Sequence, residues 1–402
     1  MVLSAFPLAD DPANGKECSM KIQAAVLRAR GAAPPYADSK PLHIETLDLD
    51  PPGKGEVLVR IAAAGLCHSD LSVINGDRPR PLPMALGHEA AGIVEELCED
   101  VNDLTIGDHV VMVFMPSCGH CLPCAEGRPA LCAPGAAANG AGTLLGDGVR
   151  LHGEGGAVHH HLGVSAFASH AVVSRRSLVK VDKELPLHEA ALFGCAVLTG
   201  VGAVVNTADV RAGQTVAVIG LGGVGLASVL GAIAAGAAHV IAVDLADDKL
   251  ALASELGATA VVKAGPDAVD TVRALTGGGC DVVLEMAGSV RALESAVAMT
   301  RRGGTTVTAG LPPHNAKLAV NVMALVADER TLKGSYIGTC VPTRDIPRYV
   351  ALYRAGRLPV DKLVSGYLRL DEINAGFDAL QAGRAVRQII RFDVDTPRVI
   401  AS

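Results

Sequence analysis

The sequence predicts an α/β protein in which a domain built on a parallel β-sheet is inserted into a second, mostly β domain. Two observations support this class: short apolar runs alternate with helical stretches between residues 197 and 337, and strand-like runs lie on both sides of this region. A chain of 402 residues is also too long for a single core, because chains beyond about 250–300 residues divide into domains.

Six short apolar runs predict the strands of the inserted sheet, and four longer stretches between them predict helices. Strands that alternate with helices in this way are typical of βαβ units around a parallel sheet, so we expect a doubly wound Rossmann sheet of six strands. The predicted strands are residues 215–219, 240–243, 260–262, 281–285, 305–309 and 332–337, and the predicted helices are residues 223–235, 247–256, 267–275 and 289–300.

The β domain is predicted from β-type runs at residues 56–62 and 92–97, which are broken by Gly/Pro turns. Residues 388–392 form another strand-like run that has no place in the six-stranded sheet, so we expect it to rejoin the β domain. The Ala/Gly-rich residues 135–142 predict no more than a mobile loop, and residues 1–20 a loose extension. The predicted division is 1–196 for the first part of the β domain, with a lobe at 114–134, then 197–337 for the inserted domain and 338–402 for the returning part.

The composition argues against several classes of function. A formal net charge of −7, with no Lys/Arg-rich run, gives no basic surface for nucleic acid. The first twenty residues have no basic stretch ahead of an apolar one and do not read as a signal peptide. The apolar residues 215–235 pass through a glycine-rich turn, which makes a membrane span a poor interpretation. We expect a cytoplasmic protein with neither nucleic-acid nor membrane partners.

Four closely spaced cysteines, Cys118, Cys121, Cys124 and Cys132, are the most informative feature of the chain. Thiols at this spacing can converge on one tetrahedral Zn²⁺ in a single lobe. Disulfides are the alternative, but a reducing cytosol favours a closed structural zinc site. We expect the separate cysteines Cys18, Cys98, Cys280 and Cys340 to be buried as small apolar residues.

A glycine fingerprint follows the predicted strand at residues 215–219 and opens a helix, which is the context that dinucleotide binding requires. Glycines permit a tight turn and close approach to a pyrophosphate, and the helix N-terminus supplies unpaired N–H groups. Asp244 ends the next strand, where a carboxylate accepts both ribose hydroxyls and repels a 2′-phosphate, so we expect NAD rather than NADP. Lys249 can reach the same ribose or remain a solvated lysine. The fingerprint consists of Gly220, Gly222, Gly223, Val224 and Gly225.

A second set of metal-ligand types is scattered over the first part of the chain. Cys67, His88 and Cys195 together make a Cys₂His set, which would leave a fourth zinc position open for catalysis. Spacing alone leaves a core cysteine with a structural histidine as an equally simple interpretation.

With these residues in view, the chain resembles a zinc-dependent alcohol dehydrogenase of the medium-chain dehydrogenase/reductase superfamily. The resemblance covers about residues 21 to 392. The matching segments are residues 65–70, 87–92, the four-cysteine lobe, 193–200, the glycine fingerprint with Asp244, 309–313 and 332–335.

The resemblance implies a GroES-like fold for the β domain and two zinc ions for each subunit. Cys67, His88 and Cys195 match the catalytic zinc ligands, with Asp70 and Glu89 as carboxylates that orient them. Ser69 matches the hydroxyl that accepts the alcohol's proton. Bound zinc would lower the pKa of the alcohol while hydride passes to nicotinamide.

Further positions are assigned by the same resemblance. It implies cofactor contacts from His68, Thr199 and Arg387, although Arg387 can also be a surface arginine. Ser72 stands where well-known members have the histidine that ends the proton relay, so a water on Ser72 or His68 would have to replace it.

Phe114 matches an inner position of the substrate pocket and suits primary alcohols with an apolar tail. Arg78 falls at the pocket mouth, where it can meet a polar or anionic substrate end or remain a solvated loop arginine. We interpret the run His159, His160 and His161 as structural or solvent-facing.

The predicted activity is hydride transfer between NAD and a primary aliphatic or aromatic alcohol and its aldehyde. One alternative is a thiol-adduct formaldehyde dehydrogenase of the S-(hydroxymethyl)glutathione type, but residues 133–139 lack the basic residue which that branch uses. A catalytically silent nucleotide-binding protein on the same scaffold is the alternative from another class. The loop between Cys132 and His159 is typical of dimeric members, so we expect a homodimer or homotetramer.

Overall fold

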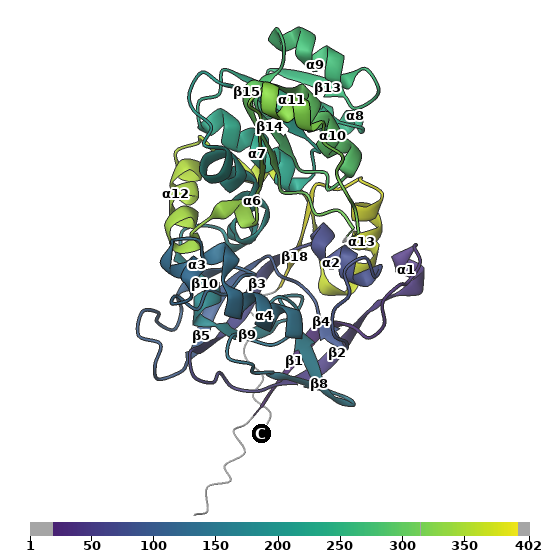
Figure 1. The fold of residues 1–402 in the computed structure, drawn as a ribbon. Helices are drawn as coiled ribbons and strands as arrows, with labels where there is room; N and C mark the ends of the chain where they lie inside the picture. The colour runs from purple at the N-terminus through teal and green to yellow at the C-terminus, as the bar shows by residue number, and fades with distance from the viewer. Residues whose placement is uncertain (1–18, 314, 393–402) are drawn as a thin grey trace, which may run out of the picture.

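The computed structural model describes residues 19–313 and 315–392. Most of the predicted extension 1–20, including Cys18, lies outside these described residues, as does the stretch 393–402 of the predicted returning part. The parallel sheet and its helices form one end of the molecule, and the antiparallel strands form the other (Figure 1).

The parallel sheet has six strands, as predicted, and each predicted strand and helix lies within a few residues of its expected place. Its strand order is that of a Rossmann sheet. The order of the strands reverses between the two central strands β11 and β14, which run parallel. In spatial order the strands are β13 (Ala260–Lys263), β12 (His239–Asp244), β11 (Thr215–Ile219), β14 (Cys280–Glu285), β15 (Thr300–Thr308) and β16 (Thr331–Gly334). The helices of this half are α7 (Gly223–Ala234), α8 (Asp247–Glu255), α9 (Ala268–Thr276), α10 (Val290–Met299) and α11 (Val322–Ala327).

The last strand of this sheet is shorter than predicted. The sequence predicted a strand to residue 337, but β16 ends at Gly334 and a 3₁₀ turn, Ile337–Thr339, follows. Ile337 has a φ of 51°, a left-handed conformation that interrupts a strand.

The other half contains a closed barrel and a second, mostly antiparallel sheet. The barrel is formed by β1 (Met20–Leu27), β2 (Leu42–Leu49), β7 (Leu151–Gly153), β8 (Gly156–His160) and β4 (Met84–Ala85). The second sheet contains β10 (Leu178–Val181), β6 (His109–Met112), β5 (Ala90–Leu97), β3 (Glu56–Gly65), β18 (Arg387–Arg391) and β17 (Val364–Leu368), and β9 (His170–Ser174) also pairs with β3. The helices here are α1 (Tyr36–Ser39), α2 (His68–Ile74), α3 (Leu122–Ala125), α4 (Ala133–Ala141), α5 (Leu187–Ala190), α12 (Pro342–Arg354) and α13 (Ile373–Gln381). The helix α6 (Ala196–Gly202) lies where the two halves join and packs against α7.

The strand near the end of the chain joins the first sheet, as its sequence predicted. β18 pairs antiparallel with β3, where Ile389 faces Gly65 and Ile390 faces Ala64. Ile389 and Ile390 are fully buried in a core cluster that also contains Leu198 and Val218. One continuous apolar core therefore connects the two halves.

The Ala/Gly-rich segment at residues 135–142 is not a loop, so that prediction is wrong. It forms most of α4, because alanine has a high helix propensity and both helix ends are capped. The Cys132 thiol accepts a hydrogen bond from the Gly135 N–H, and Gly142 ends the helix with a φ of 72°.

The described residues contain no single helix with the length and apolar character to cross a membrane. One bent pair of helical segments, Leu187–Gly194 with Ala196–Ala208, meets the length and composition requirement.

Candidate active site

The three scattered ligand types predicted for catalysis converge at one buried point. Cys67 follows β3 and precedes the first turn of α2, His88 follows β4, and Cys195 lies just before α6. Their ligand atoms all lie within 4.8 Å of one another, and the Cys195 Sγ is 3.5 Å from the His88 Nε2. Two thiols and an imidazole at this separation suit tetrahedral zinc, with one position left for another ligand. The donor set therefore fits the metal that the sequence predicted.

Asp70 orients His88 from behind. Its Oδ1 lies 3.1 Å from the His88 Nδ1 and also accepts the Gly87 N–H, so the Nε2 of His88 is turned toward the two thiols. Such a carboxylate–histidine pair fixes the ring of a metal ligand. Asp70 is completely buried, and although burial opposes ionisation, the charge of His88 helps to lower its pKa.

The run of three histidines was expected to be structural or solvent-facing, and the structure contradicts the second of these expectations. A solvent-facing run is wrong for His160 and His161, which are each only 1% exposed. The His160 Nε2 accepts the Arg150 N–H, and burial lowers its pKa to about 3, so this residue is structural. The His161 Nδ1 lies 3.1 Å from the Asp70 Oδ1, and its ring meets that of His88 edge-on. A run of three histidines has no periodicity, so nothing in the sequence indicated that His161 reaches this site.

Glu89 and Arg387 form a buried ion pair next to the ligand cluster. The Arg387 Nη2 lies 3.4 Å from the Glu89 Oε2, and its Nη1 donates to the Leu66 carbonyl. Burial raises the pKa of Glu89 to about 7 against the opposing charge of Arg387. Burial alone would favour a neutral guanidine, but the charges of Glu89 and Cys67 raise the pKa of Arg387. Arg387 is thus a buried cation, and its interpretation as a surface arginine is wrong.

A cavity of about 440 Å³ runs from this cluster to the glycine turn. It lies at the carboxyl ends of β11 and β14, where open α/β sheets bind ligands. Its lining consists of Cys67, His68, Ser69, Ser72, Arg78, Gly220, Leu221, Gly222, Gly223, Val224, Asp244, Leu245, Lys249, Met286, Ala287, Gly288, Ala309, Gly310, Leu311, Ala385, Val386 and Arg387.

The glycine turn fits a pyrophosphate. Gly220 has a φ of 88°, and a Cβ on Gly225 would collide with the Gly220 carbonyl. A Cβ on Gly222 would meet no atom within 4 Å, so the space over the turn is open. The Nε of Arg387 lies against Gly223 and is buried without a hydrogen-bond partner among the described residues. An anionic group here would satisfy that donor and the N–H groups of α7.

Asp244 lies at the other end of the cavity. Its two carboxylate oxygens accept the N–H groups of Leu221 and Ala246, at 2.6 and 2.9 Å, so the side chain is fixed in place. Lys249 lines the same end of the cavity.

The predicted relay residues line the cavity next to Cys67. Ser69 is partly buried, and the Ser72 hydroxyl donates to the His68 carbonyl at 2.8 Å. Ser72 keeps its oxygen lone pairs free to accept a proton donor.

The predicted cofactor contact Thr199 and the predicted pocket residue Phe114 do not line this cavity. Thr199 lies within α6 and is not among the lining residues. Phe114 packs edge-on against His88 at 5.2 Å and against Tyr336 at 6.3 Å, so it closes one side of the ligand cluster. Tyr336 was not predicted, although it lies just after β16. Met286, Ala287 and Gly288 were also missed, and the signal for them was their place directly after β14 at the sheet's reversal point.

The four lobe cysteines also converge. Their Sγ atoms lie within 4.8 Å of one another, and the described residues contain no disulfide. Four sulfurs on a tetrahedral zinc lie about 3.8 Å apart, so small adjustments seat the ion. The Cys124 amide helps to lower the pKa of Cys121 to about 6, whereas burial raises that of Cys124 to about 12. Opposite pKa shifts are expected where four thiols lie close together, because neighbouring thiolates repel one another and all four can ionise only when a cation binds them.

A Rossmann cleft that meets a Cys₂His cluster, together with a four-cysteine lobe, defines a zinc-binding dehydrogenase. The family models agree: residues 53–183 match the alcohol dehydrogenase GroES-like domain, and residues 223–355 match the zinc-binding dehydrogenase domain. The chain belongs to the zinc-dependent alcohol dehydrogenase family of the medium-chain dehydrogenase/reductase superfamily.

Relatives and solved structures support this membership along most of the chain. A Mycobacterium tuberculosis protein named "Putative alcohol dehydrogenase D" is 41% identical, over 92% of this chain and 100% of its own. The structure of benzyl alcohol dehydrogenase from Acinetobacter calcoaceticus is 33% identical with a TM-score of 0.87, covering 93% of this chain and 99% of that one. A zinc-binding dehydrogenase structure from Sinorhizobium meliloti, bound to NADP, is 28% identical with a TM-score of 0.75, covering 92% and 99%.

Proposed function

We propose that the protein oxidises primary alcohols to aldehydes, and reduces the aldehydes, with NAD as the hydride carrier and zinc at Cys67, His88 and Cys195. One observation carries the proposal: the thiol of Cys67, the open space over Gly222 and the carboxylate of Asp244 all line the same cavity. A cofactor lying between the glycine turn and Asp244 would therefore reach the ligand cluster. The benzyl alcohol dehydrogenase structure is consistent with a primary aromatic or aliphatic substrate.

The residues have distinct tasks in this reaction. Zinc held by Cys67, His88 and Cys195 would supply a Lewis acid that favours loss of the alcohol's proton, and NAD held along the glycine turn would be the acceptor of the hydride. The Ser69 hydroxyl accepts the proton, and Ser72 with a water passes it toward solvent. Asp70 holds His88, Glu89 balances Arg387, and Phe114 excludes water from one side of the reacting carbon. His68 lies beside Ser69 and can assist the proton's exit.

The choice of NAD over NADP follows from Asp244. Because its oxygens are held by two backbone N–H groups, the carboxylate cannot easily turn away from a 2′-phosphate. Replacing Asp244 with Asn should lower the preference for NAD on the order of 100-fold, since like charges brought together cost several kcal/mol and about 1.4 kcal/mol is tenfold. An unchanged ratio of kcat/KM for the two cofactors would remove Asp244 from ribose selection.

The reaction is tested with purified protein of known zinc content. Reduction of NAD and NADP is measured over aliphatic and benzylic alcohols, with and without glutathione, and oxidation of NADH over the aldehydes. Turnover without thiol establishes the alcohol dehydrogenase. Turnover that requires thiol establishes the adduct-specific alternative, and no turnover at full zinc occupancy indicates a silent nucleotide-binding protein.

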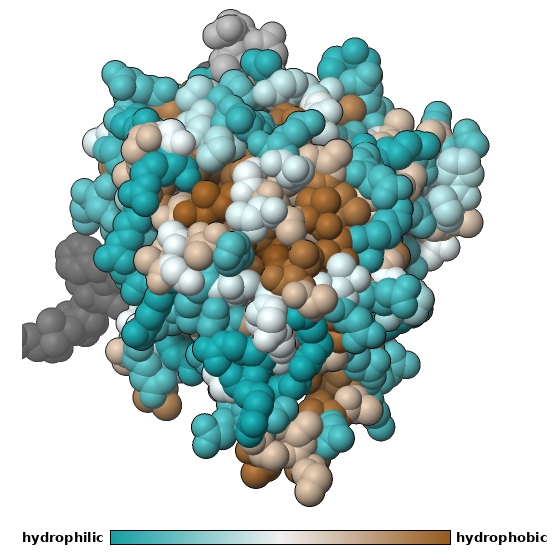
Figure 2. Space-filling view, turned by 90° about the horizontal axis from the view of Figure 1, so that it is seen from above, coloured by the Kyte–Doolittle hydropathy of each residue, from teal (hydrophilic) through white to brown (hydrophobic). Residues whose placement is uncertain are grey.

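We also propose a homodimer or homotetramer, and two features of the structure support an interface between copies. The four residues of β16 are exposed, and this strand pairs only with β15, so one edge of the parallel sheet is unpaired. Val322, Met323 and Val326 of α11 lie in the same half and are each at least 69% exposed. Figure 2 looks down on that half and shows apolar side chains gathered among polar ones. Light scattering should give at least a dimer, and a monomer would contradict the proposal. We place the enzyme in the cytoplasm, in keeping with free thiols in both clusters.

A further inference from the structure

Three arginines near the candidate active site have no acidic partner in the part of the chain that the structure describes. Among residues 19–313 and 315–392, no carboxylate pairs with the side chain of Arg78, Arg80 or Arg128. Arg80 donates one bond to the Asn139 carbonyl, and its Nε is buried without any partner in that part of the chain. We call these three residues the arginine rim. Arg78 and Arg80 are partly buried, and Arg128 is exposed.

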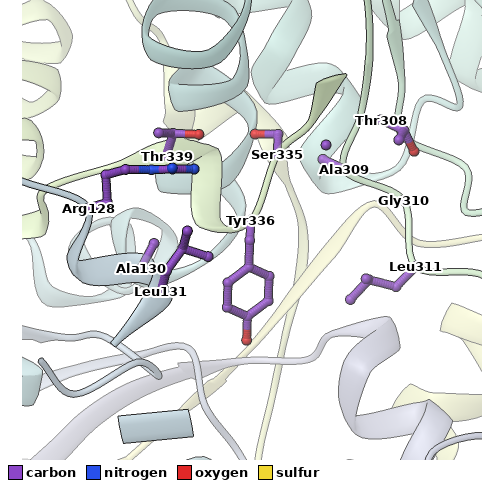
Figure 3. Close-up of a pocket in the computed structure, with 11 residues that line it drawn as sticks. Arg128, Ala130, Leu131, Thr308, Ala309, Gly310, Leu311, Ser335, Tyr336 and Thr339 are labelled. Carbon is purple, nitrogen blue, oxygen red and sulfur yellow. The ribbon is translucent and has the colours of Figure 1, made fainter. Parts of the chain in front are cut away.

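Arg128 lies in a second cavity, of about 340 Å³, between the cysteine lobe and the Rossmann half. Figure 3 shows its side chain extended beside Thr339, with Leu131, Tyr336 and Leu311 lining the same space. The lining is otherwise apolar or hydroxylic, so Arg128 is the only charged side chain among the residues that line this cavity.

This cavity adjoins the site already described. Ala309, Gly310 and Leu311 line both cavities, so the two meet at the segment after β15. Tyr336 lines the second cavity and packs edge-on against Phe114, which in turn packs against His88. A molecule with one end at the Cys67, His88 and Cys195 cluster could therefore extend past Tyr336 toward Arg128.

Arg78 and Arg80, the other two rim arginines, also lie near Tyr336. Arg78 lines the cofactor cavity. Burial raises the pKa of Tyr336, and the positive charges of Arg80 and Arg78 oppose that rise. Burial and the neighbouring charge of Arg78 lower the pKa of Arg80. Removing like charges from water without a counter-ion costs free energy, and an anion bound nearby would reduce that cost.

We propose that the preferred substrate is an alcohol or aldehyde with an apolar middle and a carboxylate at its far end, and that Arg128 binds this carboxylate while Arg78 and Arg80 add positive potential. This inference rests on the proposed function, because it needs the reacting end at the zinc cluster. The apolar middle packs against Phe114, Tyr336 and Leu311. A guanidinium suits a carboxylate because it offers two parallel N–H donors.

The test compares matched pairs of substrates on the zinc-loaded enzyme. Each pair differs only in charge: 4-(hydroxymethyl)benzoate against 4-methylbenzyl alcohol, and 8-hydroxyoctanoate against 1-octanol. We expect kcat/KM to be at least about tenfold higher for the carboxylates, and Arg128→Gln to remove most of that ratio, because a bond to a charged group contributes about 1.5–3 kcal/mol. Arg78→Gln should reduce the ratio less. Arg211→Gln, an exposed arginine paired with Asp209, is the matched control and should leave the ratio unchanged.

Binding is measured beside turnover, so that the two proposals can fail separately. Calorimetry with 4-methylbenzoate, which has no reacting alcohol, should show binding to the parent protein and at least about tenfold weaker binding to Arg128→Gln. If no alcohol is turned over but this difference persists, the proposed function fails and the anion site stands. A ratio near one for both pairs overturns the inference, as does Arg128→Gln weakening NAD binding while leaving 4-methylbenzoate binding unchanged.

Discussion

The two cysteine clusters differ in how many donors they offer and in what surrounds them. Cys67 and Cys195 are buried with one histidine at the wall of a cavity, whereas Cys118, Cys121, Cys124 and Cys132 form a set of four in a partly exposed lobe. Three protein donors leave a zinc position for a reactant, and four leave none. The difference teaches that the same metal can serve chemistry in one place and folding in the other, according to the number of ligands.

The clusters also differ in their supporting hydrogen bonds. His88 is held by the carboxylate of Asp70, while the lobe sulfurs accept backbone N–H groups, such as that of Cys118 on Cys132 and that of Cys121 on Cys118. A carboxylate tunes a ligand's orientation and basicity, whereas backbone amides tie the sulfurs to the local chain path. Removing one member from each cluster should therefore have different consequences.

The largest effect is expected from Cys195→Ala. Loss of this ligand should release one zinc for each chain and lower kcat on the order of 10³-fold, because a Lewis acid contributes several kcal/mol to the transition state. The thermal midpoint of unfolding should change little, because this zinc serves the reaction and not the fold. Zinc analysis and steady-state kinetics on the same preparation measure both quantities. Two zinc ions retained at full activity would contradict the assignment.

In the lobe, Cys121→Ser should act first on stability. Structural zinc contributes directly to folding, so loss of one thiolate should lower the thermal midpoint by several degrees and make the variant less sensitive to a chelator than the parent. Differential scanning calorimetry with and without chelator is the measurement. If stability is unchanged while kcat falls as far as in Cys195→Ala, the contrast between the two clusters is broken.

A smaller effect is expected from Asp70→Asn, which removes the charge behind His88 and keeps the shape. Replacing such partners costs about 10–100-fold in metal affinity or activity. Competition with a chromogenic chelator gives the affinity of the catalytic zinc. The lobe zinc should be unaffected, and equal weakening of both sites would point to a general loss of fold.

The smallest effect is expected from His120→Ala. His120 lies between two lobe cysteines, but its ring Nδ1 is 3.0 Å from the Cys118 carbonyl and it does not belong to the four-sulfur cluster. The change in unfolding free energy should stay within about 0.5 kcal/mol, as for most surface substitutions. Loss of the lobe zinc in this variant would show that the imidazole takes part in binding.

The parallel sheet could be predicted from sequence in detail, and the barrel could not. β11 is buried on both faces and reads as a continuous apolar run, TVAVI, before the glycine turn. β4 and β7 have only two and three residues, too few to show any alternation. α4 was missed because alanine and glycine together suggest a loop, and its caps depend on Cys132 and Gly142.

The kind of chemistry at the candidate site could be predicted from the sequence, but only some of the residues that form the site could be. The glycine turn is contiguous in sequence, so its context was visible, whereas Cys67, His88 and Cys195 are brought together only by the fold. His161 and Arg128 gave no signal in sequence, because their importance comes from neighbours that are distant along the chain. Arg387 is the opposite case: its place at the glycine turn was expected from the resemblance, while its burial against Glu89 needed the structure.

The pairing of β18 with β3 also determines when the site can be completed during synthesis of the chain. The Nη1 of Arg387 donates to the carbonyl of Leu66, a residue made 321 positions earlier, and its Nη2 meets Glu89 beside the first two ligands. A growing chain therefore holds Cys67, His88 and Cys195 well before the cation that balances them has left the ribosome. Ligand assembly can begin early, but the contacts of Arg387 with Leu66 and Glu89 form only after residue 387 has been made, so products truncated before that residue lack them.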